Sequence, residues 1–463
     1  MTESESAVAH MYDLVGVGIG PFNLSLAALA DGAPELRTLF LDAKPAFSWH
    51  PGLLMEGTTL QVPFLADLVT MVDPTSPWSY LNYLRHHDRM FPFFFSERFH
   101  IPRREYDAYC RWVAESLGSC QFDARVEELG WDEEKEAFVV THRASDGTLT
   151  RVLARQVVLG VGTNPVVPEP LRPLIAQSAH AGRVLHSADY RTHRARLAAR
   201  DDVTVIGAGQ SGAEVALDLL RHQDGDGAGG PYVRWLARTG AFAPMEYSKI
   251  GLEHFTPDYI RYFRALPEAR REQLVGEQWQ LYKGVSEETL GELHDELYER
   301  TIGGAEPRAA LHPGVAVVAA EVSGDEYVLT CRHTQQDALF EIRTSAIVSA
   351  TGYTASRPAF LGGRGGLAAL VDWDDKGRYR IDADYRVALD PRVPGRLYVQ
   401  NAELHTHGVG APDLTLGAWR AATILNAVAD RQVLRLPPRS AWTTFGAPDP
   451  DPDPDPGSAV VRP

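Results

Sequence analysis

The sequence predicts an α/β protein with two Rossmann-like dinucleotide-binding domains, the second inserted into the first, and a small, mostly helical region. Three observations support this fold class. The chain has 463 residues, too many for one ordinary hydrophobic core. The segment YDLVGVGIGPFNLSLAALA has the pattern of a strand, a glycine-rich turn and a helix. The segment DVTVIGAGQSGAEVALDLL repeats that pattern about 190 residues later.

The order of these patterns predicts the domain boundaries. Residues 1–178 should form the first part of one domain, which resumes over residues 338–436 after the inserted domain at residues 179–337. Within the insertion, residues 245–306 are polar and helical in pattern, and they could cover a substrate cleft. Residues 437–463 end in alternating Asp and Pro. Such a tail cannot bury enough apolar area to offset its ordering entropy, so we predict that it is disordered.

The composition is that of a soluble globular protein, with 44% hydrophobic and 23% charged residues. No apolar run approaches the roughly 18 residues of a membrane helix. The start, MTESESAVAH, lacks the basic and apolar parts of a secretory signal. Cys110, Cys120 and Cys331 form no C-x-x-C pair and no metal spacing, so we expect free thiols, no metal site and a cytoplasmic protein. The net charge of −16 argues against nucleic acid and anionic membranes as partners.

The first glycine turn indicates a dinucleotide site. Gly16 permits the tight turn, Gly18 lets the backbone approach a pyrophosphate, and the following helix offers its N-terminal N–H groups to the phosphates. Gly20 is displaced by one position from the usual G-x-G-x-x-G, and Pro21 takes that place, which a first helical turn tolerates. The next strand, RTLFLDAKPAFSWH, leads into Asp42, whose carboxylate can accept hydrogen bonds from ribose hydroxyls.

The second glycine turn fits G-x-G-x-x-G fully, with Gly207, Gly209 and Gly212 as its glycines. The strand after it, YVRWLARTGAF, leads into Arg238 and not into an acid. A guanidinium can pair with a 2′-phosphate, which a carboxylate would repel, so this turn favours NADPH over NADH. We therefore expect FAD at the first turn and NADPH at the second.

Two classes of protein combine FAD with NADPH. Disulfide reductases need a redox dithiol near the flavin, and the absence of C-x-x-C argues against them. Flavin monooxygenases carry the signature F-x-G-x-x-x-H-x-x-x-W. Directly ahead of the second turn, His180, Gly182, His186 and Tyr190 resemble that signature, with His for Phe and Tyr for Trp.

Longer segments make the resemblance specific. They are GVGIGPFNLSLAAL, FSWHPGLL, LQVPFLADLVT, TSPWSYLNYL, IPRREYDAYCRW, GAGQSGAEV, SATGY and HTHGVGAPDLTLGAWR. The chain resembles, from about Tyr12 to Leu436, the N-hydroxylating monooxygenases of siderophore synthesis. These enzymes hydroxylate the side-chain amine of ornithine or lysine, or one end of a diamine. The resemblance also implies a homo-oligomer, either a tetramer or a dimer.

The resemblance implies a reaction cycle. NADPH reduces FAD, O2 adds to the flavin C4a, and the retained NADP+ shields the hydroperoxide until the substrate amine attacks its distal oxygen. The amine must be neutral to attack, although a free amine of this kind has a pKa near ~10.4. Exclusion of water keeps the oxygenated flavin from decaying to peroxide.

Matching motifs imply roles for individual residues. Trp49 and His50, in FSWHP, should lie against the flavin, and Gln61, in LQVPF, should hydrogen-bond near the flavin and nicotinamide; these three are the candidate catalytic residues. The other implied cofactor contacts are Gln210 and Ser211 to the NADP+ phosphates, Arg238 to the adenosine 2′-phosphate, Thr351 and Gly352 beside FAD, and Thr415 and Leu416 near the isoalloxazine ring.

The segment FLAD indicates which amine is bound. In ornithine enzymes and in some lysine enzymes the similar segment reads F-L-K-D, and its lysine pairs with the substrate's α-carboxylate; this chain has Ala66. Two asparagines that hold the amino-acid end in those enzymes align with Leu252 and Tyr282. A diamine has no carboxylate and carries a second ammonium, for which Asp413 is the first candidate partner and Glu246 the second.

We therefore predict a diamine substrate, cadaverine or putrescine. The sequence is also similar to actinobacterial enzymes of desferrioxamine-type pathways, which act on cadaverine. L-Lysine is the alternative within the family. More distant alternatives are a Baeyer–Villiger-type enzyme that acts on a ketone, an oxidase that uses NADPH to make peroxide, and a protein of this fold that only binds.

Overall fold

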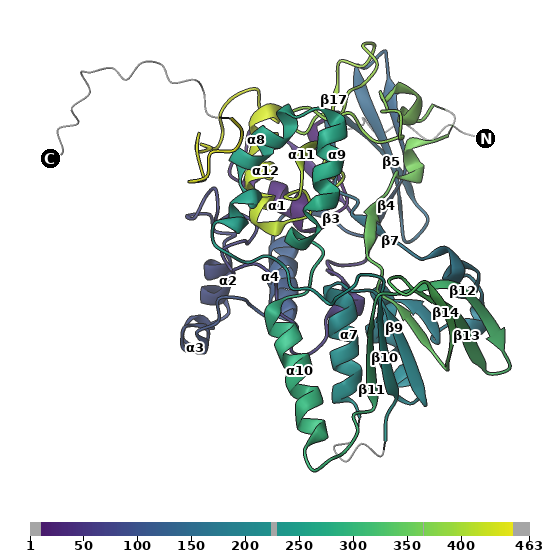
Figure 1. The fold of residues 1–463 in the computed structure, drawn as a ribbon. Coiled ribbons are helices and arrows are strands. Elements are labelled where there is room, and N and C mark those ends of the chain that lie inside the picture. The colour runs from purple at the N-terminus through teal and green to yellow at the C-terminus, as the bar shows by residue number, and fades with distance from the viewer. Residues whose placement is uncertain (1–10, 224–228, 364, 448–463) are drawn as a thin grey trace.

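The computed structural model describes residues 11–223, 229–363 and 365–447 of the chain. Most of the predicted disordered tail, residues 448–463, lies outside these ranges. Figure 1 shows two lobes, with α1 and β17 in the upper one and β9, β10 and α7 in the lower one. Among the described helices, none is long and apolar enough to cross a membrane.

The upper lobe is built on a mixed sheet in the order β3-β2-β1-β6-β5-β4, with β17 also paired to β6. Its strands are β1 (Met11–Val17), β2 (Thr38–Leu41), β3 (Cys120–Gln121), β4 (Ala124–Asp132), β5 (Ala137–Ala144), β6 (Leu149–Leu159) and β17 (Arg396–Val399). β1 is parallel to both β2 and β6, as a Rossmann-like unit requires. Helix α1 (Pro21–Ala30) follows β1 and packs against α12 (Gly417–Val428) and α4 (Arg103–Ser116).

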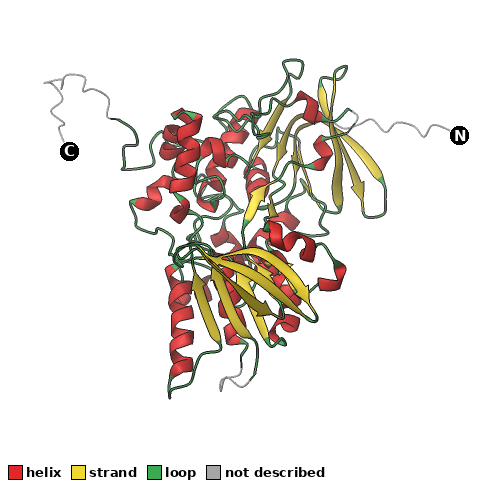
Figure 2. Ribbon diagram, turned by 45° about the vertical axis from the view of Figure 1, so that its right-hand side comes forward, coloured by secondary structure: helices red, strands yellow, loops and turns green. Residues whose placement is uncertain are grey.

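The lower lobe contains a parallel sheet in the order β11-β10-β9-β15-β8. These strands are β8 (Val184–His186), β9 (Asp202–Ile206), β10 (Tyr232–Ala237), β11 (Ala309–Pro313) and β15 (Ile347–Ser349). Helices α7 (Gln210–Arg221) and α10 (Glu287–Thr301) pack against each other beside this sheet. Figure 2 shows the strands at the bottom of the molecule with the long α10 along one side. An antiparallel meander of β12 (Val315–Ser323), β13 (Glu326–His333) and β14 (Ala338–Thr344) completes the lobe.

The strand pairing corrects one predicted boundary. We expected the first domain to resume at residue 338, but β14 pairs with β13 and β15 pairs with β8 and β9 in the second domain. The chain returns to the first domain only after residue 350. The two crossings between the domains, β7 (Thr163–Pro165) and β16 (Tyr353–Ala355), pair antiparallel with each other.

The stretch 245–306 is largely helical. It contains η5 (Gly251–Phe255), α8 (Pro257–Ala265), α9 (Glu268–Glu277), η6 (Trp279–Leu281) and α10. α10 packs on α7 of the second domain, whereas α8 and α9 pack on α11 (Leu404–His407) of the first. This stretch therefore spans both domains and does not simply extend the inserted one.

The start of the predicted disordered tail is ordered, which corrects the prediction for residues 437–447. The Phe445 ring packs on Tyr259, with 5.0 Å between ring centroids, and on Tyr262 at 6.0 Å. The Ser440 backbone N–H donates to the Asp258 carboxylate over 2.7 Å. This part of the tail carries aromatic side chains, and they can bury area that the Asp/Pro repeat cannot.

The first domain also sends a short segment into the second. The turn η1 (Pro51–Leu53) leads the chain into the core of the lower lobe, where Leu53 and Met55 are 4% and 2% exposed. A Cβ atom on Gly52 would lie 1.7 Å from the carbonyl oxygen of Ala188, so only glycine fits this crossing. The two domains therefore share a packed interior as well as two connecting strands.

Candidate active site

A cleft of about 2420 Å³ lies between the domains. It is lined by residues 59–63 and 411–416 of the first domain, 206–211 of the second, 281–284 of the helical stretch and 350–357 of the return crossing. The two domains, the helical stretch and the return crossing therefore meet at one site. This site is large enough for two nucleotide cofactors and a small substrate.

The first glycine turn is fixed by close packing. A Cβ atom on Gly16 would lie 2.1 Å from the Phe40 ring. Gly18 has φ +90°, and its Cβ would lie 2.4 Å from the Gly160 oxygen, so both glycines are required by the fold. Gly20 differs, because no heavy atom lies within 4 Å of its ideal Cβ position. This side of the turn is open for a phosphate at the start of α1.

Asp42 braces the same turn. Its Oδ2 accepts the Ile19 N–H over 2.7 Å and its Oδ1 accepts the Lys44 N–H over 2.9 Å. Pro21 begins α1, as predicted from its position after Gly20. None of these residues lines the cleft between the domains. A ribose contact from Asp42 stays a prediction.

The second turn is packed against the return crossing. Gly207 has φ +135°, and a Cβ atom there would lie 2.1 Å from the carbonyl oxygen of Ala350. A Cβ on Gly212 would lie 2.3 Å from the Gly207 oxygen. Gly209 and Ser211 line the cleft at the start of α7, where backbone N–H groups face a possible phosphate.

Gln210 is committed to other protein groups. Its Nε2 donates to Glu214 Oε1 over 2.8 Å and to Thr289 Oγ1 over 2.9 Å, while its Oε1 accepts the Ser286 N–H over 2.7 Å. The side chain thus joins α7 to the start of α10. For the predicted contact to an NADP+ phosphate, the Gln210 side-chain N–H group would have to donate to the phosphate as well as to one of its present partners.

Arg238 lies just beyond the end of β10 and lines the cleft with an exposed side chain. Among the described residues, no carboxylate lies within ion-pair distance of its guanidinium. A cation without a protein partner at this edge of the sheet is suited to a phosphate group.

Gln61 carries the clearest sign of a missing partner. The residue lines the cleft and is half-buried, and its Nε2 is buried without a hydrogen-bond partner among the described residues. A buried amide donor normally finds a partner. The orphaned N–H group therefore fits a ligand acceptor in the cleft.

Trp49 and His50 form the adjoining wall. The backbone N–H of Trp49 donates to the Asp107 carboxylate over 2.7 Å. The Trp49 ring meets the Tyr106 ring edge-on, with 5.0 Å between the ring centroids. His50 has φ +46° in the left-handed region, and its ring is open to the cleft. Desolvation by the surrounding protein, followed by the positive charges of Arg103 and Lys44, lowers the pKa of His50 to about 4. His50 is therefore neutral at physiological pH.

Arg103 makes a buried ion pair that the sequence analysis missed. Its Nη1 and Nη2 bind the two carboxylate oxygens of Glu214 over 2.8 and 2.7 Å, which joins α4 of the first domain to α7 of the second. The side chains are 12% and 4% exposed. The only sequence signal was an acid on the apolar face of α7, and its partner lies 111 residues away.

Asp413 places a partly buried carboxylate in the cleft. Its Oδ1 accepts the Thr415 N–H over 2.7 Å and caps the turn η9 (Leu414–Leu416), while its Oδ2 makes no hydrogen bond to the described residues. Burial raises the pKa of this carboxyl, and it outweighs the hydrogen bonds from Thr415, which act to lower the pKa. Burial, followed by the charge of Asp413, raises the pKa of Tyr247, which also lines the cleft, to about 12. Thr415 and Leu416 line the same wall.

The other predicted substrate residues divide into two groups. Glu246, Leu252 and Tyr282 line the cleft, with Glu246 and Leu252 exposed and the Tyr282 hydroxyl bonded to a backbone oxygen. Ala66 is 3% exposed and does not line the cleft, which corrects its assignment as a substrate contact. The turn in which its N–H donates to the Pro63 oxygen buries the methyl group.

Thr351 and Gly352 line the cleft beside the return crossing. The Thr351 hydroxyl donates to the Val166 oxygen over 2.5 Å. His186, from the monooxygenase-like signature, bonds the Gly352 oxygen through Nε2 over 3.2 Å, and its ring lies 5.1 Å from Tyr353. The signature residue therefore holds the crossing in place and does not line the cleft.

Two further features escaped the sequence analysis. Asn401 lines the cleft with φ +62°, two residues after the end of β17, and a polar residue just beyond the carboxyl end of a parallel strand was the available signal. Behind the cleft, Arg420 and Glu403 form an ion pair of 2.9 Å with both side chains almost fully buried. Arg420 also donates to the Ala411 oxygen over 2.7 Å and so braces the loop that carries Asp413.

Comparisons with known proteins agree with this geometry. The family described as L-lysine 6-monooxygenase/L-ornithine 5-monooxygenase matches residues 10–355. The chain is 40% identical to a putrescine N-hydroxylase from Shewanella oneidensis, over 94% of this chain and 84% of the relative.

Two solved structures are similar over nearly their whole length. One is DfoA bound to FAD, the cadaverine monooxygenase of the desferrioxamine biosynthetic pathway from Erwinia amylovora, with 35% identity, a TM-score of 0.88 and coverage of 95% of this chain and 99% of that one. The other is the Kutzneria sp. 744 ornithine N-hydroxylase with reduced FAD, NADP+ and L-ornithine, with 26% identity, a TM-score of 0.82 and coverage of 91% and 99%.

Proposed function

The chain belongs to the L-lysine 6-monooxygenase/L-ornithine 5-monooxygenase family, and we propose that its substrate is an aliphatic diamine, cadaverine or putrescine. It is a flavin-dependent N-hydroxylating monooxygenase. Two relatives with substantial identity are described as a putrescine N-hydroxylase and a cadaverine monooxygenase, which supports the diamine. The hydroxylated amine would serve the synthesis of a hydroxamate siderophore.

The residues present fit FAD and NADPH. The open side of Gly20 at the start of α1 suits a pyrophosphate, and Arg238 offers a cation to a 2′-phosphate. The orphaned N–H group of Gln61 suits an acceptor on the flavin or nicotinamide. When bound, these cofactors supply the reducing equivalents and the activated oxygen atom that the reaction transfers to the amine nitrogen.

The observation that carries the diamine proposal is Asp413. Its Oδ2 has no partner among the described residues, and burial disfavours its ionised form. An ammonium group bound there would satisfy that oxygen and restore the charge. An α-carboxylate at the same place would meet a like charge. The far end of a diamine matches this wall of the cleft, and an amino-acid carboxylate does not.

The reacting end of the amine must be neutral, and the surroundings of His50 favour this. Desolvation is the first cause of the lowered pKa of His50, and a desolvated position also disfavours the charged form of a nearby amine. With a pKa of about 4, His50 is also too weak a base to hold the proton at neutral pH. The reacting amine would therefore release its proton to solvent. One end of the diamine is held charged by Asp413 while the other becomes a nucleophile.

L-Lysine is the second candidate, and one observation favours it. Lys249 and Lys283 line the cleft, close in sequence to Leu252 and Tyr282, where the resemblance places the amino-acid end. Either ammonium could pair with an α-carboxylate. Both side chains are exposed, so such a pair would be screened by solvent.

A four-substrate comparison tests the proposal. NADPH consumption and hydroxylamine formation are measured together with cadaverine, putrescine, L-lysine and L-ornithine. We expect the highest kcat/KM with a diamine. A higher value with L-lysine would show that the diamine assignment is wrong. NADPH consumption without hydroxylamine from any amine would instead favour a peroxide-forming oxidase, or a Baeyer–Villiger enzyme if a ketone is oxygenated.

We also propose the compartment in which the enzyme acts and its state of assembly. We infer a cytoplasmic enzyme, because its cysteines are free among the described residues and its reaction consumes NADPH. We also infer a homo-oligomer, a dimer or a tetramer, as the family resemblance predicts. Fractionation of cells and sedimentation of the purified protein would test the two inferences separately.

A further inference from the structure

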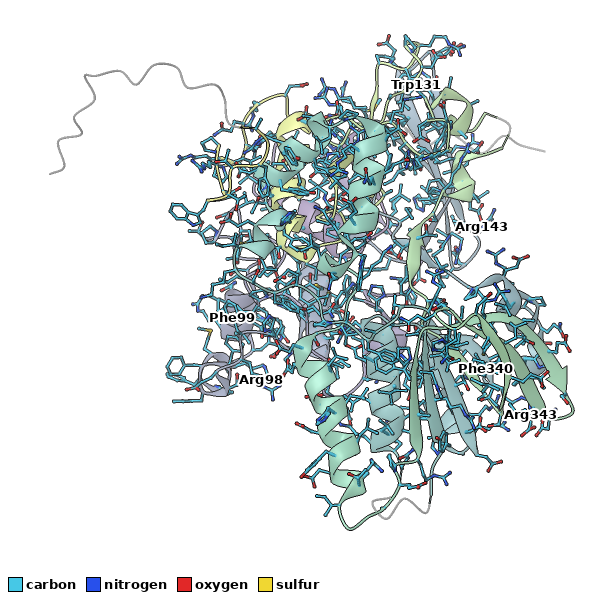
Figure 3. The ribbon with its side chains drawn as sticks, in the orientation of Figure 1. Arg98, Phe99, Trp131, Arg143, Phe340 and Arg343 are labelled. Atoms are coloured by element: carbon cyan, nitrogen blue, oxygen red, sulfur yellow. The ribbon has the colours of Figure 1, made fainter. Side chains whose placement is uncertain are left out.

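We propose that helix α3 (Met90–Ser96) and the chain beside it form an interface through which two copies of this protein associate. α3 has no buried residue. Figure 1 shows it at the outer edge of the molecule, beyond α2 (Tyr80–His86), and Figure 3 places Arg98 and Phe99 next to it. The surface consists of α3 and the flanking residues 88–89 and 97–99; we call it the α3 face.

Phenylalanines dominate the α3 face. Phe91, Phe94, Phe95 and Phe99 are 76%, 70%, 72% and 54% exposed. The rings of Phe94 and Phe95 lie 5.2 Å apart, and those of Phe91 and Phe95 stack at 6.5 Å, so they form one patch. A cluster of exposed aromatic rings costs free energy in water, and such a cluster marks a contact surface.

Contacts on the inner side of α3 hold the helix in place. Phe93 packs inward against Phe64 at 5.2 Å and against Tyr80 at 5.5 Å between ring centroids. Phe99 also touches Phe64, at 5.9 Å. The inward contacts fix the position of the helix, while most of its phenylalanines face outward. The apolar face is therefore presented on a fixed support and is not the result of a loose segment.

The exposed area matches what a dimer requires. A fully buried aromatic side chain contributes roughly 150–250 Å², so the four phenylalanines, which are 54–76% exposed, offer roughly 400–700 Å² per copy. A standard interface buries about 800 Å² per partner. Met90, which is on α3 and 41% exposed, extends the apolar area toward that value.

The flanking charges favour a second copy as the occupant. The sequence reads D-R before α3 and E-R after it, as Asp88-Arg89 and Glu97-Arg98. Asp88, Glu97 and Arg98 are exposed, and none of them forms an ion pair with the described residues. If two copies of α3 pack antiparallel about a two-fold axis, Asp88 of each copy comes beside Arg98 of the other. The face is thus complementary to itself, as an isologous interface requires.

The contact would reach the active site. Phe99 and His100 line the rim of the cleft as well as bordering the α3 face. A second copy on this face would therefore cover part of the cleft entrance. The proposal concerns the assembly, and its test does not depend on which amine is the substrate.

The assembly is tested by sedimentation velocity of the full-length, FAD-loaded enzyme at micromolar concentration. We expect the wild-type protein to be at least a dimer. Replacing Phe94 and Phe95 together by serine should reduce the molar mass by half, because the apolar contact is lost. The matched control replaces Leu339 and Phe340, which are 62% and 36% exposed on β14, by serine, and its mass should equal that of the wild type. A monomeric wild type, or equal masses for both double variants, would overturn the proposal.

A charge exchange provides a test that does not alter the apolar surface. Arg98→Asp should weaken the assembly, because it places two acids together, and Asp88→Arg in the same chain should restore it. Both residues are exposed, so neither change should prevent folding, and bound FAD reports on this. Failure of the second substitution to restore the mass would contradict antiparallel packing of α3.

Discussion

Replacing Asp413 by asparagine should weaken diamine binding without changing the local structure. In the wild type, Oδ1 accepts the Thr415 N–H over 2.7 Å and caps η9. Asparagine caps as well as aspartate, so this bond survives the substitution. The partner for the second ammonium loses its charge, and the amide also brings a donor toward that ammonium.

The magnitude follows from the worth of a charged hydrogen bond, about 1.5–3 kcal/mol. At 1.36 kcal/mol per factor of ten, kcat/KM for cadaverine or putrescine should fall about 10- to 150-fold. Steady-state assays should follow hydroxylamine and NADPH together. Glu246→Gln is the matched control, since that acid lies in the same cleft but is exposed, and it should change kcat/KM by much less.

The same substitution has a predictable effect on stability. Burial raises the pKa of Asp413, so the folded enzyme without substrate disfavours the ionised carboxylate. The free-energy cost of the ionised carboxylate is absent below the pKa that Asp413 has in the unfolded chain. It reaches its full value above the raised pKa of the folded enzyme. Asp413→Asn should therefore raise Tm at neutral pH, and the difference should shrink as the pH falls below the raised pKa and vanish below the pKa of the unfolded chain. A lower Tm at neutral pH, or unchanged diamine kinetics, would refute the role of Asp413.

Three further predictions concern the cofactor side of the cleft and the domain contact. Arg238→Gln should raise the KM for NADPH about 10- to 150-fold, through the loss of a charged hydrogen bond, and leave that for NADH unchanged; equal effects on both would exclude a 2′-phosphate contact. Glu214→Ala, which removes the whole carboxylate partner, should reduce the free energy of unfolding in urea by about 3–5 kcal/mol, because Arg103 stays buried without any partner at that place, and an unchanged midpoint would contradict this. The His50 imidazole should titrate in NMR spectra with a pKa of about 4, and a midpoint near 6.5 would show that the ring is not desolvated.

The glycine turns were predictable because short-range sterics determine them. Gly16, Gly18 and Gly207 lie where a Cβ atom would collide with a neighbouring strand or crossing, and a sequence pattern records such collisions directly. The family was predictable for a similar reason, since its motifs surround the cofactor cleft. The matching family confirms that prediction.

Long-range partners were not predictable. The strand at Ile347–Ser349 has the apolar pattern of any buried parallel strand, and nothing in that pattern says which of two sheets it joins. Gln210 looked free for a phosphate, because its bonds to Ser286 and Thr289 connect residues far apart in sequence. Ala66 was interpreted as the absence of a lysine, and its burial depends on a local turn that the pattern did not indicate.

The entry of η1 into the lower lobe matters for protein engineering. A chimera that exchanges the inserted domain between relatives could be cut at the two connecting strands, β7 and β16. With such cuts, Leu53 and Met55 of the recipient's first domain would have to pack inside a core that comes from another protein. A working graft should carry residues 51–55 together with the inserted domain, so the functional exchange unit is discontinuous in the gene.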